Sequence, residues 1–267
     1  MNYYLQDSVF IKTYNMSYIL NSTFYKKDSI GSGTYCNAYK ITKDKVIKFY
    51  DTENYLDDSK CFCNEVQNEI EFIKKFNNCN FITKSFIILE YNKKLIIIQE
   101  YAKIINVRFY DYFIFIKKIN YFLDILKIHI YFYSKNYINL DIKSTNMGYV
   151  DNKLKLFDFN LIIEIDKYKK IDLLSSYKYY YLHPPTPSFP KYIISYSIAI
   201  LILESFSTPS ENQKYLYKPK DIINDKFSLL EFKKPCLGIK LFKILNECFE
   251  CTKCLYSLLN DFESLKT

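Results

Sequence analysis

The first hundred residues contain short runs that are typical of β-strands, arranged as a hairpin with a third strand and, further along, a second pair. Residues 24–41, "FYKKDSIGSGTYCNAYKI", predict a hairpin that feeds a third strand at residues 45–50, "KVIKFY", with turns at the glycines and at "TKDK". Residues 86–91, "FIILEY", and 95–101, "LIIIQEY", predict a second antiparallel pair across "NKK". These runs restrict the first part of the chain to a small antiparallel sheet.

One helical run lies between the two strand pairs. In residues 63–76, "CNEVQNEIEFIKKF", the apolar residues Val66, Ile70 and Ile73 recur on one face of a helix, and carboxylates flank them. The pattern predicts an amphipathic helix. We therefore expect a small lobe over about residues 1–101, made of a sheet and one helix.

The chain changes character after the connector "YAKIIN". Residues 119–137, "INYFLDILKIHIYFYSKNY", are helical by length and apolar density, residues 154–159 read as a short strand, and residues 196–206, "YSIAILILESF", as a buried helix. No apolar run is long enough to span a bilayer. We predict an α+β, bilobal fold: one domain over residues 1–267, with a mainly helical large lobe over about 102–267 and the ligand cleft at the connector.

Length, charge and the N-terminal sequence indicate what kind of protein this is. A chain of 267 residues can bury a large core without disulfides. The net charge is +8, but Lys, Ile, Asn and Tyr are all abundant, as in an A+T-rich genome of a virus or parasite, so we expect the lysines to scatter over the surface. Nucleic acid is not expected as the main partner. The N-terminus shows no signal-peptide pattern, which predicts an intracellular protein, cytoplasmic or nuclear.

Eight cysteines without a secretory signal predict reduced thiols. Cys248, Cys251 and Cys254 have a spacing that resembles part of a zinc or iron–sulfur site, and Cys236 is a candidate fourth ligand. The surrounding segment has helical apolar spacing, in which small buried thiols fit equally well, and we favour that interpretation.

The stretch "INLDIKSTN", residues 138–146, carries the most specific chemistry. A carboxylate can accept a hydroxyl proton, a lysine can neutralise a migrating phosphoryl group, and a carboxamide oxygen can bind Mg²⁺. Asp141, Lys143 and Asn146 supply these three groups. Asp158, at the end of the strand "KLKLF", is a candidate second oxygen ligand for the metal.

Phosphate recognition needs backbone amides that side chains do not obstruct. Gly31 and Gly33 provide them in a strand–turn–strand setting rather than in the strand-to-helix setting of a dinucleotide site. Lys48 lies on the following strand, and Glu69 lies on the next helix, where its carboxylate can hold that lysine over the phosphates.

With these motifs in this order, residues 24–262 resemble the eukaryotic protein kinase family. "GSGTYCNAYK" is similar to the glycine-rich loop, "VIK" to the ATP-contacting lysine motif, and "NEIEFIKKFNNCNFI" to the helix that carries its glutamate partner. "NLDIKSTN" resembles the catalytic loop, "DFN" the metal-binding DFG triplet, and "YSIAILILE" the buried helix after the activation segment. The resemblance implies the bilobal kinase fold and the use of ATP and Mg²⁺.

The resemblance also implies roles for single residues. Asp141 and Lys143 would be catalytic, with Asp141 orienting the acceptor hydroxyl and Lys143 contacting the γ-phosphate. Asn146 and Asp158 would hold the metal. A lysine two residues after the aspartate is the serine/threonine form of this loop, so we expect a protein substrate with a Ser or Thr acceptor and a kinase that acts as a monomer.

Residues of the first lobe would bind the nucleotide. Glu100 and Ala102 would offer hinge backbone groups to adenine, and Gln99 would be the gatekeeper behind it. The set expected to contact ATP or to orient a contacting group is Gly31, Gly33, Ala38, Lys48, Glu69, Glu100 and Ala102.

The chain departs from the family pattern at several positions. Cys36 replaces the third loop glycine, and Ala38 the valine that usually follows. The histidine and arginine before the catalytic aspartate are Asn139 and Leu140, so a phosphorylated activation loop has no charge-assisted partner there and regulation by loop phosphorylation is not expected. Asn160 replaces the DFG glycine and tolerates turn dihedrals.

Two further departures lie in the large lobe. Thr186 stands where a glutamate is usual, and no downstream arginine is present to pair with it, so that ion pair is lost as a whole. Ile194 stands where the family has an aspartate that supports the catalytic-loop backbone.

These departures keep an alternative open, in which the protein is a pseudokinase that acts as a binding or decoy module. A small-molecule kinase of related fold is disfavoured by Lys143 and by "YYLHPPTPSF", which resembles the end of the activation segment of protein kinases. We interpret His129 as a packed core histidine, His183 as a loop residue, and the tyrosines of "YKYYY" as structural.

Overall fold

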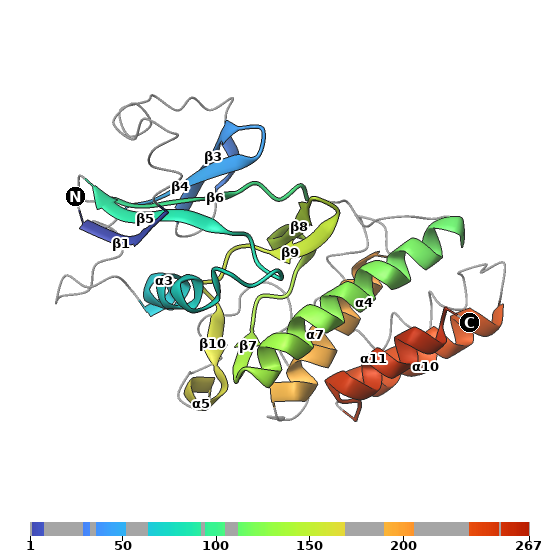
Figure 1. Cartoon of the computed structure of the whole chain (residues 1–267). Coiled ribbons are helices and arrows are strands. Elements are labelled where there is room, and N and C mark those ends of the chain that lie inside the picture. Colours follow the sequence, from blue (N-terminus) through green and yellow to red (C-terminus); the bar gives the residue numbers. More distant parts are fainter. Residues whose placement is uncertain are drawn as a thin grey trace. The chain divides into compact units, whose positions relative to one another are not determined.

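The computed structural model describes residues 2–7, 29–32, 36–51, 64–91, 94–104, 112–168, 190–205, 235–250 and 252–266 (Figure 1). The chain divides into two compact units. The first unit comprises Met1–Ile104 and Met147–Leu161, and the second Ile105–Asn146 and Ile162–Thr267. Several sequence predictions lie outside the described residues: those for Gly33, Tyr177, Tyr179–Tyr181, His183, Thr186 and Cys251.

The first unit contains a six-stranded antiparallel sheet in the order β1-β5-β6-β4-β3-β2. Five of its strands confirm the predicted strand runs, whereas the N-terminal strand, Asn2–Gln6, was not predicted. The strands are β1 (Asn2–Gln6), β2 (Ser29–Ser32), β3 (Cys36–Thr42), β4 (Lys45–Asp51), β5 (Ser85–Tyr91) and β6 (Lys94–Glu100).

Alternation of side chains along β4 gives the two faces of the sheet different environments. Ile47 packs into an apolar cluster with Ile87, Leu89, Ile96 and Ile98 on one face. The predicted amphipathic helix is α3 (Asn64–Phe76), and it lies against the other face (Figure 1). The residues of β4 that neighbour Ile47 in sequence therefore point toward this helix.

A short hairpin extends the first unit. It consists of β8 (Met147–Val150) and β9 (Lys153–Leu156), and it is attached by backbone bridges of Tyr149 to Lys103 and of Leu156 to Ile82. The sequence analysis places this segment in the large lobe, whereas these bridges attach it to the first unit. That the two units form one kinase domain stays a prediction.

Gly148 is required by the close approach of this hairpin to the chain after β6. A Cβ atom at this position would lie 2.9 Å from the carbonyl carbon and oxygen of Lys103. Any side chain would push the two backbones apart, so glycine allows the bridge between Lys103 and Tyr149 to form.

The second unit is mainly helical, as predicted, and its long helices lie side by side in Figure 1. α7 is apolar on all sides and its described side chains from Ile194 to Ile202 are buried, which confirms the predicted buried helix. The elements are α4 (Tyr112–Ser134), β7 (Tyr137–Asn139), the 3₁₀ turn η3 (Ser144–Asn146), β10 (Ile162–Glu164), α5 (Ile165–Tyr168), α7 (Pro190–Ser205), α10 (Pro235–Phe249) and α11 (Leu255–Ser264). In the described part of the chain no helix is long and apolar enough to cross a membrane.

The cysteine-rich segment forms two helices rather than one continuous run. α10 ends at Phe249 and α11 begins at Leu255, with Cys254 at the N-cap position of α11. Cys248 is buried in α10, and neither Cys248 nor Cys254 forms a disulfide within the described residues. The apolar spacing thus reflects two packed helices on either side of a turn.

Lys118 of α4 is a buried cation that makes stability depend on pH. Its ammonium donates to the carbonyl of Ser205 at the C-terminal end of α7, 2.8 Å away. Burial lowers the pKa of Lys118 from its usual 10.5 to about 8.

We therefore expect the free energy of unfolding to rise between about pH 8 and pH 10.5, because the unfolded chain keeps a proton that the folded protein has released. Relative to Lys118→Met, the wild type should gain up to about 3 kcal/mol across this window, since one pH unit in a pKa corresponds to about 1.4 kcal/mol. Urea unfolding at several pH values measures the difference. Lys117→Met, an exposed neighbour, should follow the wild type, and a Lys118→Met curve parallel to wild type would contradict the assignment.

Candidate functional site

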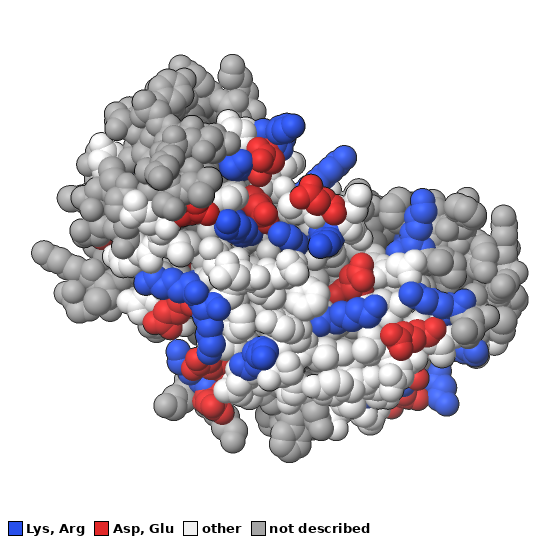
Figure 2. Space-filling model, in the orientation of Figure 1, with Lys and Arg blue, Asp and Glu red and all other residues white. Residues whose placement is uncertain are grey.

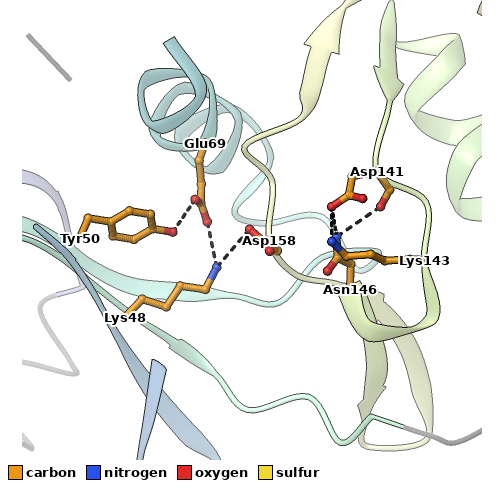
Figure 3. Close-up of polar contacts among 7 residues, drawn as sticks. All are labelled: Lys48, Tyr50, Glu69, Asp141, Lys143, Asn146 and Asp158. Atoms are coloured by element: carbon orange, nitrogen blue, oxygen red, sulfur yellow. Dashed lines mark hydrogen bonds and ion pairs between the residues drawn. The ribbon is translucent and has the colours of Figure 1, made fainter. Parts of the chain in front are cut away.

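A buried ion pair joins the sheet of the first unit to its helix. Lys48 Nζ lies 3.0 Å from Glu69 Oε1, and both side chains are almost fully buried (Figure 3). The pair forms because alternation along β4 points Lys48 toward α3, where Glu69 lies on the covering face. The structure thus brings together the two residues that the sequence placed on neighbouring elements.

Tyr50 holds the other oxygen of the same carboxylate. Its hydroxyl donates to Glu69 Oε2 at 2.5 Å (Figure 3). Burial, and next the Glu69 carboxylate, raise the pKa of Tyr50 well above its usual value, so the phenol stays protonated and remains a donor. The sequence analysis missed this residue, although Tyr50 follows Lys48 by two positions and therefore had to share its face of β4.

Replacing Tyr50 by phenylalanine should lower the free energy of unfolding by about 2 kcal/mol, the usual range for a hydrogen bond to a charged group. Urea denaturation measures the loss. Tyr91→Phe is the matched control, because its hydroxyl has no hydrogen-bond partner among the described residues, and it should cost less than about 0.5 kcal/mol. Equal losses in the two variants would show that the bond to Glu69 contributes nothing specific.

Asp158 approaches the same lysine but leaves an oxygen unsatisfied. Its Oδ1 lies 4.0 Å from Lys48 Nζ, is buried, and accepts no hydrogen bond from any described residue. An orphaned carboxylate oxygen suits a hard cation such as Mg²⁺, which prefers oxygen ligands. The backbone of Asp158 is left-handed, with φ of 70°, whereas Asn160 is not among the residues with positive φ. The left-handed residue of this turn is thus the aspartate itself rather than Asn160.

Two carboxylates act on the charge of Lys48. Burial alone would lower its pKa, but the negative charges of Glu69 and Asp158 outweigh burial and raise the pKa above its usual value. Lys48 therefore remains an ammonium group that can attract phosphate oxygens.

The predicted loop residues that the structure describes lie in one row across the sheet. Gly31 pairs with Ala38, and Ala38 pairs with Lys48. Gly31 is exposed, and no atom of the described residues lies within 4 Å of the position a Cβ would take. Burial raises the pKa of the neighbouring Cys36 to about 11, so its thiol stays protonated beside Lys48. The two residues that lie beside Lys48 in this row, Gly31 and Ala38, are therefore small.

The predicted hinge residues lie at the end of β6 and directly after it. The backbone N–H and C=O of Ala102 make no hydrogen bond within the described ranges, and the buried Gln99 Oε1 also lacks a donor there. The Glu100 side chain is engaged, because its Oε2 accepts from Lys155 Nζ at 2.7 Å and from the Lys84 amide at 2.9 Å. The Glu100 amide donates to the Lys84 carbonyl, so Ala102 is the better placed of the two to offer a backbone donor.

A pocket of about 570 Å³ opens at the end of this sheet. Glu100 and Tyr101 line it together with Phe86, Lys103 and Tyr149. Neither Lys48 nor Asp158 contributes to its wall, so the pocket is separate from the ion pair.

The second unit holds the other predicted cluster. Lys143 Nζ lies 2.6 Å from Asp141 Oδ2, and Asn146 Nδ2 donates to the same oxygen at 2.8 Å and to the Asp141 carbonyl at 3.2 Å (Figure 3). η3 brings Asn146 back toward Asp141. Because the amide nitrogen of Asn146 is used inside the loop, its carboxamide oxygen is the atom that could bind a cation.

Lysines are interspersed with acidic side chains over the face shown in Figure 2. The described residues on this face form no continuous basic stripe of the kind that follows a nucleic-acid backbone.

A family model described as protein kinase domain matches residues 24–185. The chain belongs to the protein kinase family. The matched segment includes every predicted site residue of this kinase, from Gly31 to Asp158, and the six-stranded sheet with its helices is the α+β fold expected of such a domain. A search of curated proteins finds no match. Membership supports phosphoryl transfer to protein substrates in general, in a family that generally uses ATP and Mg²⁺.

Proposed function

We propose that the protein is an active serine/threonine kinase that transfers the γ-phosphate of Mg²⁺-ATP to a protein hydroxyl. The observation that carries this proposal is the buried ammonium of Lys48 between Glu69 and the unsatisfied oxygen of Asp158. A kinase without catalytic function has no physical need for a costly buried pair beside an orphaned carboxylate.

Each residue has a role in this proposal. Lys48, oriented by Glu69, binds phosphate oxygens of the nucleotide. Asp158 and the Asn146 carboxamide oxygen would hold Mg²⁺, which supplies positive charge to the phosphates when bound. Lys143 contacts the γ-phosphate.

Asp141 acts on the acceptor. Its carboxylate accepts the hydroxyl proton as the hydroxyl oxygen bonds to the γ-phosphorus, while the bond from phosphorus to the β-phosphate oxygen breaks and ADP leaves. Lys143 Nζ lies 2.6 Å from this carboxylate.

The preference for serine and threonine rests on the position of Lys143 two residues after Asp141. It is tested by labelling a degenerate peptide mixture that contains Ser, Thr and Tyr with γ-labelled ATP, followed by phosphoamino-acid analysis. Phosphoserine or phosphothreonine as the main product supports the proposal. Phosphotyrosine as the main product would replace the acceptor assignment.

A binding module is the second candidate function, favoured by the half-buried, protonated Cys36 beside Lys48 where the family has a glycine. Thermal shift separates the two. Stabilisation by a non-hydrolysable ATP analogue that requires Mg²⁺ supports catalysis, whereas metal-independent or absent stabilisation supports the binding module.

A further inference from the structure

The backbone of Asp141 is held from both sides by asparagines. Its N–H donates to Asn139 Oδ1 at 2.8 Å, and its C=O accepts from Asn146 Nδ2 at 3.2 Å. Asn139 is the last residue of β7 and is only 5% exposed. Its side-chain amide is therefore shielded from water, which could otherwise replace its hydrogen-bond partners.

His129 of α4 determines which way this amide faces. His129 Nδ1 lies 2.7 Å from the carbonyl oxygen of Ile125, which can only accept, so Nδ1 carries the hydrogen. Burial lowers the pKa of His129 to about 4, and the ring is neutral near pH 7. Its Nε2 is then an acceptor, and it lies 3.5 Å from Asn139 Nδ2.

Each polar atom in this series of hydrogen bonds can act either as a donor or as an acceptor, but not as both. Because Nε2 of His129 can only accept, the NH₂ group of Asn139 must face the ring. The oxygen of Asn139 is thereby turned toward the Asp141 amide, which can only donate. An inverted Asn139 amide would set two acceptors against each other and two donors against each other, so the orientation is fixed.

The support that the family resemblance assigns to this loop is absent from its usual position. Ile194 occupies the position of the aspartate that the family resemblance assigns to this task, and it is a buried aliphatic residue of α7. An isoleucine side chain cannot accept a hydrogen bond from a loop amide.

We propose that His129 and Asn139 form a positioning pair that fixes the Asp141 backbone in place of the missing aspartate. The catalytic consequence rests on the proposed kinase function. A displacement of about 1 Å in a reacting group can cost on the order of a hundredfold in rate, so the pair should act on turnover rather than on nucleotide binding.

Amide hydrogen exchange at Asp141, followed by NMR, tests the positioning role without requiring activity. In Asn139→Leu the amide loses its acceptor, and its exchange should become at least about tenfold faster. His129→Phe should cause a smaller change in the same direction, because the oxygen of Asn139 remains but is free to turn away. Asn120→Leu, on an exposed position of α4, is the control and should leave exchange unchanged.

Kinetics test the catalytic consequence. Asn139→Leu should lower kcat about 10–100-fold with KM for ATP within about twofold. The double variant with His129→Phe should be no slower than Asn139→Leu alone, since both changes interrupt one chain of contacts. Independent, additive losses or a change confined to KM would overturn the pairing.

The outcomes separate the two proposals. Unchanged exchange at Asp141 in the folded variants overturns the positioning pair, and His129→Phe decides the question if Asn139→Leu does not fold. Faster exchange in a protein whose wild type shows no phosphoryl transfer leaves the positioning pair standing and overturns the proposed function.

Discussion

Replacing Asp141 by asparagine is expected to lower phosphoryl transfer by about 10²–10⁴-fold, the usual contribution of a positioned general base. An asparagine keeps the shape of the side chain but cannot accept the hydroxyl proton, and it ends the ion pair with Lys143. Nucleotide-dependent stabilisation should persist, because the nucleotide-binding residues are elsewhere. A filter-binding assay with γ-labelled ATP measures the rate.

Asp151→Asn is the matched control for this prediction. Asp151 is exposed in the turn between β8 and β9 and has φ of 49°, a conformation that asparagine also tolerates. This variant should transfer phosphate at the wild-type rate. Activity of Asp141→Asn equal to that of the control would mean that Asp141 is not the base.

Lys48→Met should have the largest effect on stability as well as a large effect on activity. Removing the ammonium leaves Glu69 as a buried carboxylate whose remaining partner among the described residues is Tyr50, and breaking a buried pair in this way costs about 3–5 kcal/mol. Loss of an electrostatic contact to the phosphates should also reduce kcat/KM by at least about 10²-fold.

A double variant separates the two effects. In Lys48→Met/Glu69→Gln the buried negative charge is gone, while the amide oxygen of the glutamine can still accept from Tyr50. Most of the lost stability should return, whereas activity should not. A stability loss below about 1 kcal/mol in Lys48→Met would contradict the buried pair.

Much of the first unit could be predicted because its strands are short apolar runs bounded by turn residues and its helix is amphipathic. The pairing of β1 with β5 could not, since "NYYLQ" is a five-residue run with no turn or alternation that marks its partner strand. The assignment of β8 and β9 to the first unit depends on backbone bridges of Lys103 and Ile82, which side-chain patterns do not encode.

The candidate residues could be found from motif order, but their partners could not. Tyr50 and His129 carry no motif, and each acquires its role through an atom on another element: Glu69 Oε2 for the tyrosine and the Asn139 amide for the histidine. Sequence reasoning treated Asn139 only as a lost histidine and Ile194 only as a lost aspartate. The hydrogen bond from the Asp141 amide shows that one departure can offset the other.

Transfer of labelled γ-phosphate to a generic basic protein, compared with and without Mg²⁺ for the wild type, Asp141→Asn and Lys48→Met, tests the central claim most directly. The proposed function predicts Mg²⁺-dependent incorporation by the wild type and a loss of at least about a hundredfold in both variants. Equal incorporation by all three proteins, or incorporation that is insensitive to Mg²⁺, would contradict it.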